Sequence, residues 1–452
     1  MNMPSSIIIE LPGGKISAAS NGDLVRARGL RYASASRFQR PKPVEKWDEI
    51  ADCTGPAPIC PQIVPFELDF VTGPITAGRE QSEDCLHVSV TTTVDALSDG
   101  RKRPVMVFLH GGAYVSGGAD LDCYEPSGLV ERGVVGVNIS YRLGIFGFQP
   151  IPDVAPANLG LMDQIEALRW IQRNIAAFGG DSNNVTVFGQ SAGAASIHFL
   201  MIADGTEGLF HRAIIQSAPL EHWTPEREKM VKDLGILARD EVHRDSNTQT
   251  SGDMLLLQQQ LFLVAESYGS PHAPFKPLMG SEPLPDQADV AQRISQVAKR
   301  VPMMIGYTKD EGVPFVRKND TLRPYLALAF IGSFIEWIAA WFIGKVFTWF
   351  LDGFHKEYRR AGGTSILYRF NWRPIQSSLR APHCIELPFL LGSWSSWKAA
   401  PMLGGMSNQH AVEELGDRMK GIWIDFARGN MDKEVRSFTI KGNQDYWEVV
   451  FR

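Results

Sequence analysis

Short β-rich runs alternate with segments of helical periodicity through much of this chain, and this alternation is the feature that most limits its fold. Residues 105–109 (VMVFL) and 185–188 (VTVF) are typical of strands buried on both faces. The pattern recurs at residues 134–139, 213–215, 303–305 and 366–370. We predict from it an α/β fold, in which a central, mostly parallel, twisted sheet carries helices on both faces.

Two segments are typical of helices that would cover such a sheet. Between Gly160 and Ile175 the apolar residues recur at helical spacing, and Gly179 with Gly180 ends the segment. A late helix is expected over residues 410–427. Residues 236–260 are polar and favour a helical surface insertion. No repeat or low-complexity linker divides the chain, so we predict one domain over residues 1–452.

Charge and cysteine content exclude several functions. The 45 basic and 50 acidic residues give a net charge of −5, which provides no footprint for nucleic acid and no polybasic membrane signal. No basic run precedes the three isoleucines near the N-terminus, so a secretory signal is not expected. The five cysteines have no zinc-site spacing. We expect a cytoplasmic protein without metal or cofactor, and consider secretion or peripheral membrane association less favoured.

Residues 325–354 form the most apolar and aromatic segment of the chain. A membrane span needs about 20 nearly uncharged residues. Glu336 and Lys345 interrupt this segment, and its longest uncharged run is the 11 residues from Tyr325 to Ile335. We therefore predict no transmembrane span.

A nucleophile elbow is indicated by residues 189–193 (GQSAG). This G-x-S-x-G sequence follows the strand predicted at 185–188 and precedes an alanine-rich helical segment. Small residues allow the sharp strand–turn–helix reversal that exposes the serine hydroxyl above the sheet. The pattern predicts Ser191 as a nucleophile for acyl transfer.

Ser191 needs a base and an acid, which follow it in this chain order in such folds. His383 lies in a loop after the strand predicted at 366–370, where a catalytic histidine belongs. Asp310 and Glu311 follow the strand predicted at 303–305, and either could be the acid by position alone.

Residues 110–114 (HGGAY) follow the strand predicted at 105–109. A loop of this HGG type supplies backbone N–H groups to a developing oxyanion. The N–H of Ala192, directly after the nucleophile, adds another donor.

Together these motifs resemble the type-B carboxylesterases, the cholinesterase-like branch of the α/β-hydrolases. The resemblance extends over most of the chain, and the segments that carry it, in order, are SEDCL (82–86), HGGAY (110–114), YRLG (141–144), NLGLMDQ (158–164), FGGD (178–181), GQSAG (189–193), RAIIQS (212–217), DEG (310–312), HCIEL (383–387) and WIDFA (423–427).

The resemblance implies an α/β-hydrolase fold and a role for each motif residue. It implies a triad of nucleophile, acid and base at Ser191, Glu311 and His383. The implied oxyanion donors are Gly112, Ala113 and Ala192. It further implies two structural ion pairs, Arg37 with Glu83 and Arg142 with Asp163. Many relatives have a disulfide at the positions of Cys60 and Cys85. We expect free thiols at these positions in this chain, because no secretion signal is expected.

Two departures from the cholinesterases argue against a cationic choline substrate. Residues 71–78 (VTGPITAG) contain no aromatic ring for a cation–π contact. Gln190 replaces the glutamate that precedes their nucleophile. The segment 325–354 stands where the family builds part of its acyl pocket. We predict that a hydrophobic substrate pocket is lined by Tyr114, Gln190, Phe330, Trp337, Trp341 and Phe342. For the aromatic residues of segment 325–354, burial in helix packing or in a dimer face remains an alternative.

The favoured function is hydrolysis of a small, uncharged, hydrophobic carboxylic ester through an acyl-enzyme. One alternative keeps the triad but acts as a transesterase, acyltransferase or deacylase of a specialised metabolite. Another is a non-catalytic adhesion protein such as the neuroligin-like relatives, which the three filled triad positions argue against.

Overall fold

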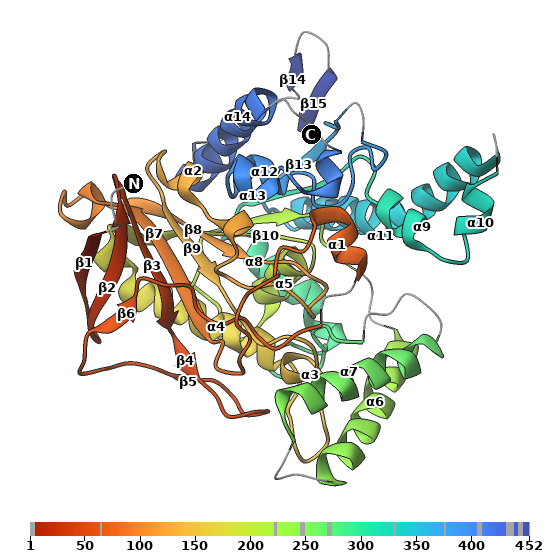
Figure 1. Ribbon diagram of the computed structural model, residues 1–452, viewed down its shortest axis with the longest axis horizontal. Helices are drawn as coiled ribbons and strands as arrows, with labels where there is room; N and C mark the ends of the chain where they lie inside the picture. The colour runs from red at the N-terminus through yellow and green to blue at the C-terminus, as the bar shows by residue number, and fades with distance from the viewer. Residues whose placement is uncertain are drawn as a thin grey trace.

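One large sheet forms the centre of the molecule (Figure 1). The computed structural model describes residues 5–63, 66–220, 224–244, 249–268, 274–328, 331–374, 377–404, 409–430, 438–441 and 446–451. Within these ranges thirteen strands join in the sheet: β1 (Ser5–Leu11), β2 (Gly14–Asn21), β3 (Leu24–Arg31), β6 (Ala51–Cys53), β7 (His87–Thr93), β8 (Arg103–Leu109), β9 (Val135–Ile139), β10 (Gly180–Gln190), β11 (Arg212–Gln216), β12 (Met303–Thr308), β13 (Ser365–Phe370), β14 (Phe438–Lys441) and β15 (Tyr446–Phe451). A separate pair is formed by β4 (Ala33–Ser34) and β5 (Lys42–Pro43).

The six central strands are parallel and run in the order β9-β8-β10-β11-β12-β13. Each corresponds to one of the six runs predicted from the sequence, and β9 begins one residue after its predicted start. On one side β1, β2, β3 and β7 extend the sheet in antiparallel fashion, and on the other β15 and β14 do so. The parallel strands share one carboxyl edge, where Gly189 pairs with Leu109 and Gln190 with Gln216.

Helices cover both faces of the sheet, as expected from the alternation. Their bounds are α1 (Phe66–Thr72), α2 (Ser127–Val130), α3 (Gly144–Gly147), α4 (Leu159–Asn174), α5 (Ala192–Ile202), α6 (Pro225–Arg244), α7 (Ser251–Glu266), α8 (Val290–Ala298), α9 (Val313–Lys318), α10 (Arg323–Leu326), α11 (Ile331–Arg360), α12 (Leu387–Leu390), α13 (Trp394–Trp397) and α14 (Gln409–Arg428). The predicted helices at 160–175 and 410–427 correspond to α4 and α14.

The alternation of side chains along β8 shows how the two faces are filled. Val105, Val107 and Leu109 belong to the core beneath α4, α5 and α8. Met106 and Phe108 belong to a second core beneath α12 and α14. Because both sets are buried, the strand has no polar face, which explains its continuous apolar sequence.

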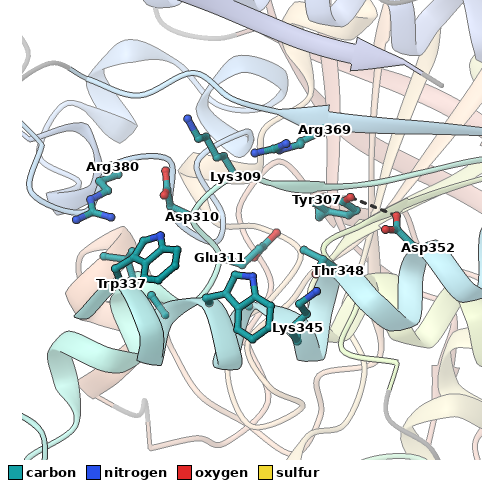
Figure 2. A pocket seen from close by; sticks show the side chains of 14 residues that line it. Tyr307, Lys309, Asp310, Glu311, Trp337, Lys345, Thr348, Asp352, Arg369 and Arg380 are labelled. Carbon is teal, nitrogen blue, oxygen red and sulfur yellow. Dashed lines mark hydrogen bonds between the residues drawn. The ribbon is translucent and has the colours of Figure 1, made fainter. Parts of the chain in front are cut away.

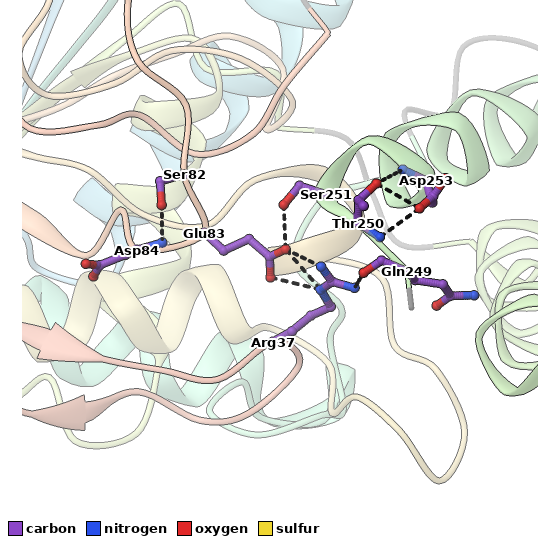
Figure 3. Close-up of polar contacts among 8 residues, drawn as sticks. All are labelled: Arg37, Ser82, Glu83, Asp84, Gln249, Thr250, Ser251 and Asp253. Atoms are coloured by element: carbon purple, nitrogen blue, oxygen red, sulfur yellow. Dashed lines mark hydrogen bonds and ion pairs between the residues drawn. The ribbon is translucent and has the colours of Figure 1, made fainter. Parts of the chain in front are cut away.

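The two ion pairs implied by the family resemblance are confirmed. Arg37 donates from Nε to Glu83 Oε2 at 2.9 Å, and Ser251 at the start of α7 donates to the same carboxylate (Figure 3). Arg142 donates from Nε to Asp163 Oδ2 at 2.8 Å, with both side chains buried. Such charge-assisted pairs fix the loops between the strands. Cys60 and Cys85 are buried free thiols.

Helix α11 protrudes with α9 and α10 from one end of the molecule (Figure 1). Its length and composition would allow it to cross a membrane, and it is the one helix in the described ranges of which this is true. Only 17% of its most apolar 18-residue window is buried. Its C-terminal half, by contrast, packs on the sheet through Leu351, Phe354 and Tyr358.

Candidate active site

Ser191 occupies a strained turn between β10 and α5. Its backbone has φ 56° and ψ −124°, outside the regions that L-residues ordinarily adopt. The neighbouring glycine makes the turn possible, because a Cβ on Gly193 would lie 2.0 Å from the Leu109 carbonyl oxygen. The Ser191 N–H donates to the Gln216 carbonyl at 2.9 Å, which fixes the turn to β11. This geometry is that of the expected nucleophile elbow.

His383 and Glu311 meet at the carboxyl edge of the sheet, although 71 residues separate them in the chain. His383 Nδ1 lies 2.6 Å from Glu311 Oε2, and both side chains are buried. The other carboxylate oxygen of Glu311 accepts hydrogen bonds from the Thr308 N–H at 2.7 Å and the Ser217 hydroxyl at 2.5 Å. Two donors, the Thr308 N–H and the Ser217 hydroxyl, therefore hold this carboxylate toward the imidazole.

Of the two acids left open by position, Glu311 is the one that contacts His383. Asp310 instead accepts from the backbone N–H of Ala381 at 3.2 Å, while its own N–H donates to the Ala381 carbonyl. Asp310 thus fastens the loop that carries His383.

The other edge of the imidazole faces the elbow. His383 Nε2 lies 3.1 Å from the side-chain amide nitrogen of Gln190, the residue before the nucleophile. In the part of the chain that the structure describes, no hydrogen bond joins the Ser191 hydroxyl to His383. Gln190 therefore holds the nitrogen through which His383 would act as a base.

Two phenylalanine rings, one on α9 and one on α11, pack against the imidazole. The Phe347 ring centroid lies 4.8 Å from that of His383, and the Phe315 centroid lies 5.8 Å from it. Sequence reasoning did not single out either ring. Burial by itself lowers the pKa of His383, but the neighbouring Cys384 and Glu311 outweigh this effect, and the pKa lies well above its ordinary value.

The loop after β8 presents backbone groups near the elbow. Gly112 has φ 108°, and its Cβ, if it had one, would lie 2.2 Å from the Ser116 carbonyl oxygen. Ala113 and Tyr114 also have positive φ values, of 55° and 62°. Among the described residues, no hydrogen-bond acceptor engages the N–H of Gly112 or Ala113. The N–H of Ala192 belongs to the first turn of α5, where helical N–H groups have no partner within the helix.

A second buried carboxylate, Glu386, lies beside Glu311. Its Oε1 is 3.5 Å from the Ser217 hydroxyl, which also bonds Glu311. Burial and the negative charge of Glu311 raise the pKa of Glu386 to about 7. Sequence reasoning included both Ser217 and Glu386 in family motifs but gave them no role; their adjacency depends on β11 and the His383 loop meeting in space.

The predicted pocket residues lie in different environments. Trp337 and Trp341 line a cavity of about 390 Å³ between α11 and the ends of β12 and β13, with Glu311 at its wall (Figure 2). Phe342 is not among the residues that line this cavity and is exposed. Tyr114 is buried, 3.4 Å from the Ser196 hydroxyl and packed on Phe148.

Phe330 lies outside the described residues, and the pocket assignment as a whole stays a prediction. Within the described ranges, no group of three or more His, Cys, Asp or Glu side chains is arranged to hold a metal ion.

Comparison with known proteins identifies relatives along almost the whole chain. The sequence profile of the carboxylesterase family matches residues 8–324. A probable N-octanoylanthranilate hydrolase of Rhodococcus erythropolis is 34% identical over 425 residues, which cover 92% of each chain. The para-nitrobenzyl esterase of Bacillus subtilis (strain 168) is 30% identical over 94% of this chain and 91% of its own.

The structural comparison agrees with the sequence match. A solved structure of a PNB esterase superposes with a TM-score of 0.80 at 28% identity, covering 99% of this chain and 97% of its own. The α/β-hydrolase fold expected from the motifs is thereby confirmed. With its elbow and the loop after β8 set on that fold, the chain belongs to the carboxylesterase family and is a carboxylesterase.

Proposed function

We propose that this carboxylesterase hydrolyses small, uncharged, hydrophobic esters through an acyl-enzyme on Ser191, with His383 as base and Glu311 as its orienting acid. The observation that carries the proposal is the 2.6 Å contact between His383 Nδ1 and Glu311 Oε2 beside the strained elbow. A buried acid on Nδ1 holds the imidazole with its Nε2 lone pair toward the nucleophile.

The reaction follows from these positions. Ser191 Oγ attacks the ester carbonyl carbon while its proton passes to His383 Nε2. The N–H groups of Gly112, Ala113 and Ala192 bind the oxyanion of the tetrahedral intermediate. Its collapse breaks the bond to the alcohol oxygen, which takes the proton from His383. Water activated by the same nitrogen then releases the acid and restores Ser191.

The environment of the imidazole supports an uncharged substrate. Phe315 and Phe347 pack near His383, and the carboxylate that would attract a cation is replaced by the neutral Gln190. A charged acyl group packed against these rings would lose part of its hydration, which costs free energy.

The test is turnover of nitrophenyl esters of increasing acyl length by the native chain and by Ser191→Ala. The variant should lose several orders of magnitude in kcat. An irreversible organophosphonate should label one residue, and mass mapping should locate it at Ser191. Near-normal turnover in the variant, or a label elsewhere, would contradict the assignment.

A second candidate is deacylation of an N-acyl aromatic amide with the same residues. It is favoured by the relative from Rhodococcus erythropolis, whose name specifies an N-octanoylanthranilate hydrolase. The two candidates differ in the leaving group, an alcohol or an amine. Measuring kcat/KM for an octanoyl nitrophenyl ester and for N-octanoylanthranilate side by side distinguishes them, because an ester-specific enzyme leaves the amide intact.

A further inference from the structure

Exposed apolar side chains gather on α10, α11 and the turn between them. In the described part of the chain, eight of the sixteen exposed large apolar residues lie between residues 325 and 349. We call this set the aromatic face; its members are Tyr325, Leu328, Ile331, Phe334, Trp337, Trp341, Phe342 and Trp349. A contiguous apolar surface of this kind marks a docking site rather than an ordinary solvated surface.

Helix α11 is apolar both on the side that packs toward the sheet and on the side that is exposed. Its buried positions include Phe347, Leu351 and Tyr358, which lie on the side toward the sheet. Ile331, Phe342 and Trp349 are exposed, and helical spacing places them on the opposite side. A helix that is apolar on both sides requires a second apolar environment.

The helix is fixed to the fold along its length, so the aromatic face cannot be covered by rotating α11. The Glu336 carboxylate forms ion pairs with Arg317 of α9 and with Arg380 of the loop before His383, each at 3.0 Å. Phe347 packs against His383, and Tyr358 donates to the Val301 carbonyl at 2.5 Å. These contacts also prevent α11 from crossing a bilayer while the sheet is intact.

Cations extend the aromatic face toward the C-terminal end of α11. Lys356, Arg359 and Arg360 are exposed, and helical spacing places them on the side of Ile331 and Trp349. Between residues 317 and 360 the sequence has seven Lys or Arg and four Asp or Glu, a net charge of +3, in a chain whose net charge is −5. The expectation against peripheral membrane association rested on the net charge of the whole chain, which does not reveal this local excess of positive charge.

We propose that the aromatic face docks onto an anionic lipid surface, with α11 lying in the plane of the interface. Tryptophan and tyrosine favour the boundary between lipid chains and water, and cations beside them attract anionic headgroups. Lys345 fits this setting because its ammonium extends over the Trp341 ring, 4.6 Å from the centroid, and can reach the headgroup layer while its stem stays among apolar groups.

A second copy of the chain fits the aromatic face less well. A two-fold dimer along α11 with parallel helices would bring Lys356, Arg359 and Arg360 of one copy close to the same cations of the other. A lipid surface of opposite charge avoids this cost. The docking proposal does not depend on the proposed esterase mechanism.

Vesicle flotation tests the proposal. The native chain should float with vesicles of phosphatidylcholine and phosphatidylglycerol, bind weakly to phosphatidylcholine alone, and be released by high salt because screening weakens the cation contribution. The double variant Ile331→Ser/Phe334→Ser should lower the partition coefficient by about tenfold or more. Arg359→Glu/Arg360→Glu should weaken binding to the anionic vesicles alone.

The matched control is Leu256→Ser/Leu263→Ser, which removes two exposed leucines from α7 and should leave binding unchanged. Turnover of a soluble short-chain ester should be the same in all four proteins, which separates docking from the proposed mechanism. Brominated lipids should quench the tryptophan fluorescence of the native chain. No flotation and no quenching would overturn the proposal, as would a native dimer that Ile331→Ser/Phe334→Ser converts to monomers without any vesicle binding.

Discussion

The amide nitrogen of Gln190 lies 3.1 Å from His383 Nε2, the ring nitrogen that would accept the proton of Ser191 in the proposed mechanism. The base is therefore occupied by a neutral neighbour before substrate arrives. In the proposed mechanism, His383 would exchange this contact for one to the Ser191 hydroxyl. The residue before the nucleophile is thus placed to influence both the proton affinity and the position of the imidazole.

Gln190→Glu tests this influence. A carboxylate at the same place accepts a hydrogen bond from the protonated imidazole and stabilises its charge, so the pKa of His383 should rise by about one unit or more. The acidic limb of the kcat/KM profile should move upward by the same amount, while the plateau at high pH changes much less. Gln190→Ala is the control, because it removes the contact without adding charge; equal shifts in both variants would contradict the electrostatic explanation.

The pH profile of the native enzyme should report the raised pKa of His383. Only the neutral imidazole accepts a proton, so kcat/KM should increase with pH and reach half its maximum above the ordinary histidine value of about 6.5. Glu311→Gln removes the carboxylate that stabilises the imidazolium. That variant should be much slower and should have its midpoint at lower pH, whereas a midpoint that stays in place would show that Glu311 does not set the pKa.

Glu386 should make stability depend on pH. Its pKa in the folded protein is about 7, above its ordinary value, so the folded state holds a proton that the unfolded state has already lost. The free energy of unfolding should therefore decrease as pH rises from about 4.5 to about 7. Glu386→Gln should remove this part of the decrease, so that urea unfolding at pH 5 and pH 8 differs less than in the native chain; an unchanged difference would contradict it.

Gly112→Ala should impair the reaction through the oxyanion loop. The added Cβ would lie 2.2 Å from the Ser116 carbonyl oxygen, and φ is 108°, so the loop must move. Losing one donor of this kind costs about 10²–10³ in kcat. Gly78→Ala is a matched control, because Gly78 also has a positive φ, of 74°, but has nothing within 4 Å of an added Cβ. It should lose a little stability and retain activity.

The sequence predicted the central strands because they are buried on both faces and read as continuous apolar runs. The antiparallel strands β1 to β3 were not predicted. In β2 the buried positions are Ile16, Ala18 and Ser20, and the last two hardly differ in size or polarity from the less buried Ser17 and Ala19 between them. The alternation that marks a half-buried strand is therefore weak there, and the partner β1 lies at the edge of the sheet.

The site could be predicted where its positions follow from chain order. Ser191, Glu311 and His383 each come after a strand of the parallel set, and carboxyl ends of parallel strands meet at one edge. Position alone left Asp310 and Glu311 open, and only the family resemblance implied Glu311. The contact of Gln190 with His383 depends on side-chain directions that no spacing encodes. Phe347 was missed for a similar reason, because α11 passes over the Glu311 loop at a distance that only the packed fold sets.

Glu336, held between Arg317 and Arg380, gives α11 a rigid connection to the loop that ends at His383. That carboxylate and Phe347 are the contacts through which a tilt of this helix would reach the imidazole. If fixing the imidazole changes the affinity of α11 for lipid, then docking of α11 to lipid must change the affinity of the site for an inhibitor by the same factor. An inhibitor that fixes the imidazole should then alter lipid partitioning, and attachment to a bilayer should alter inhibitor affinity to the same degree.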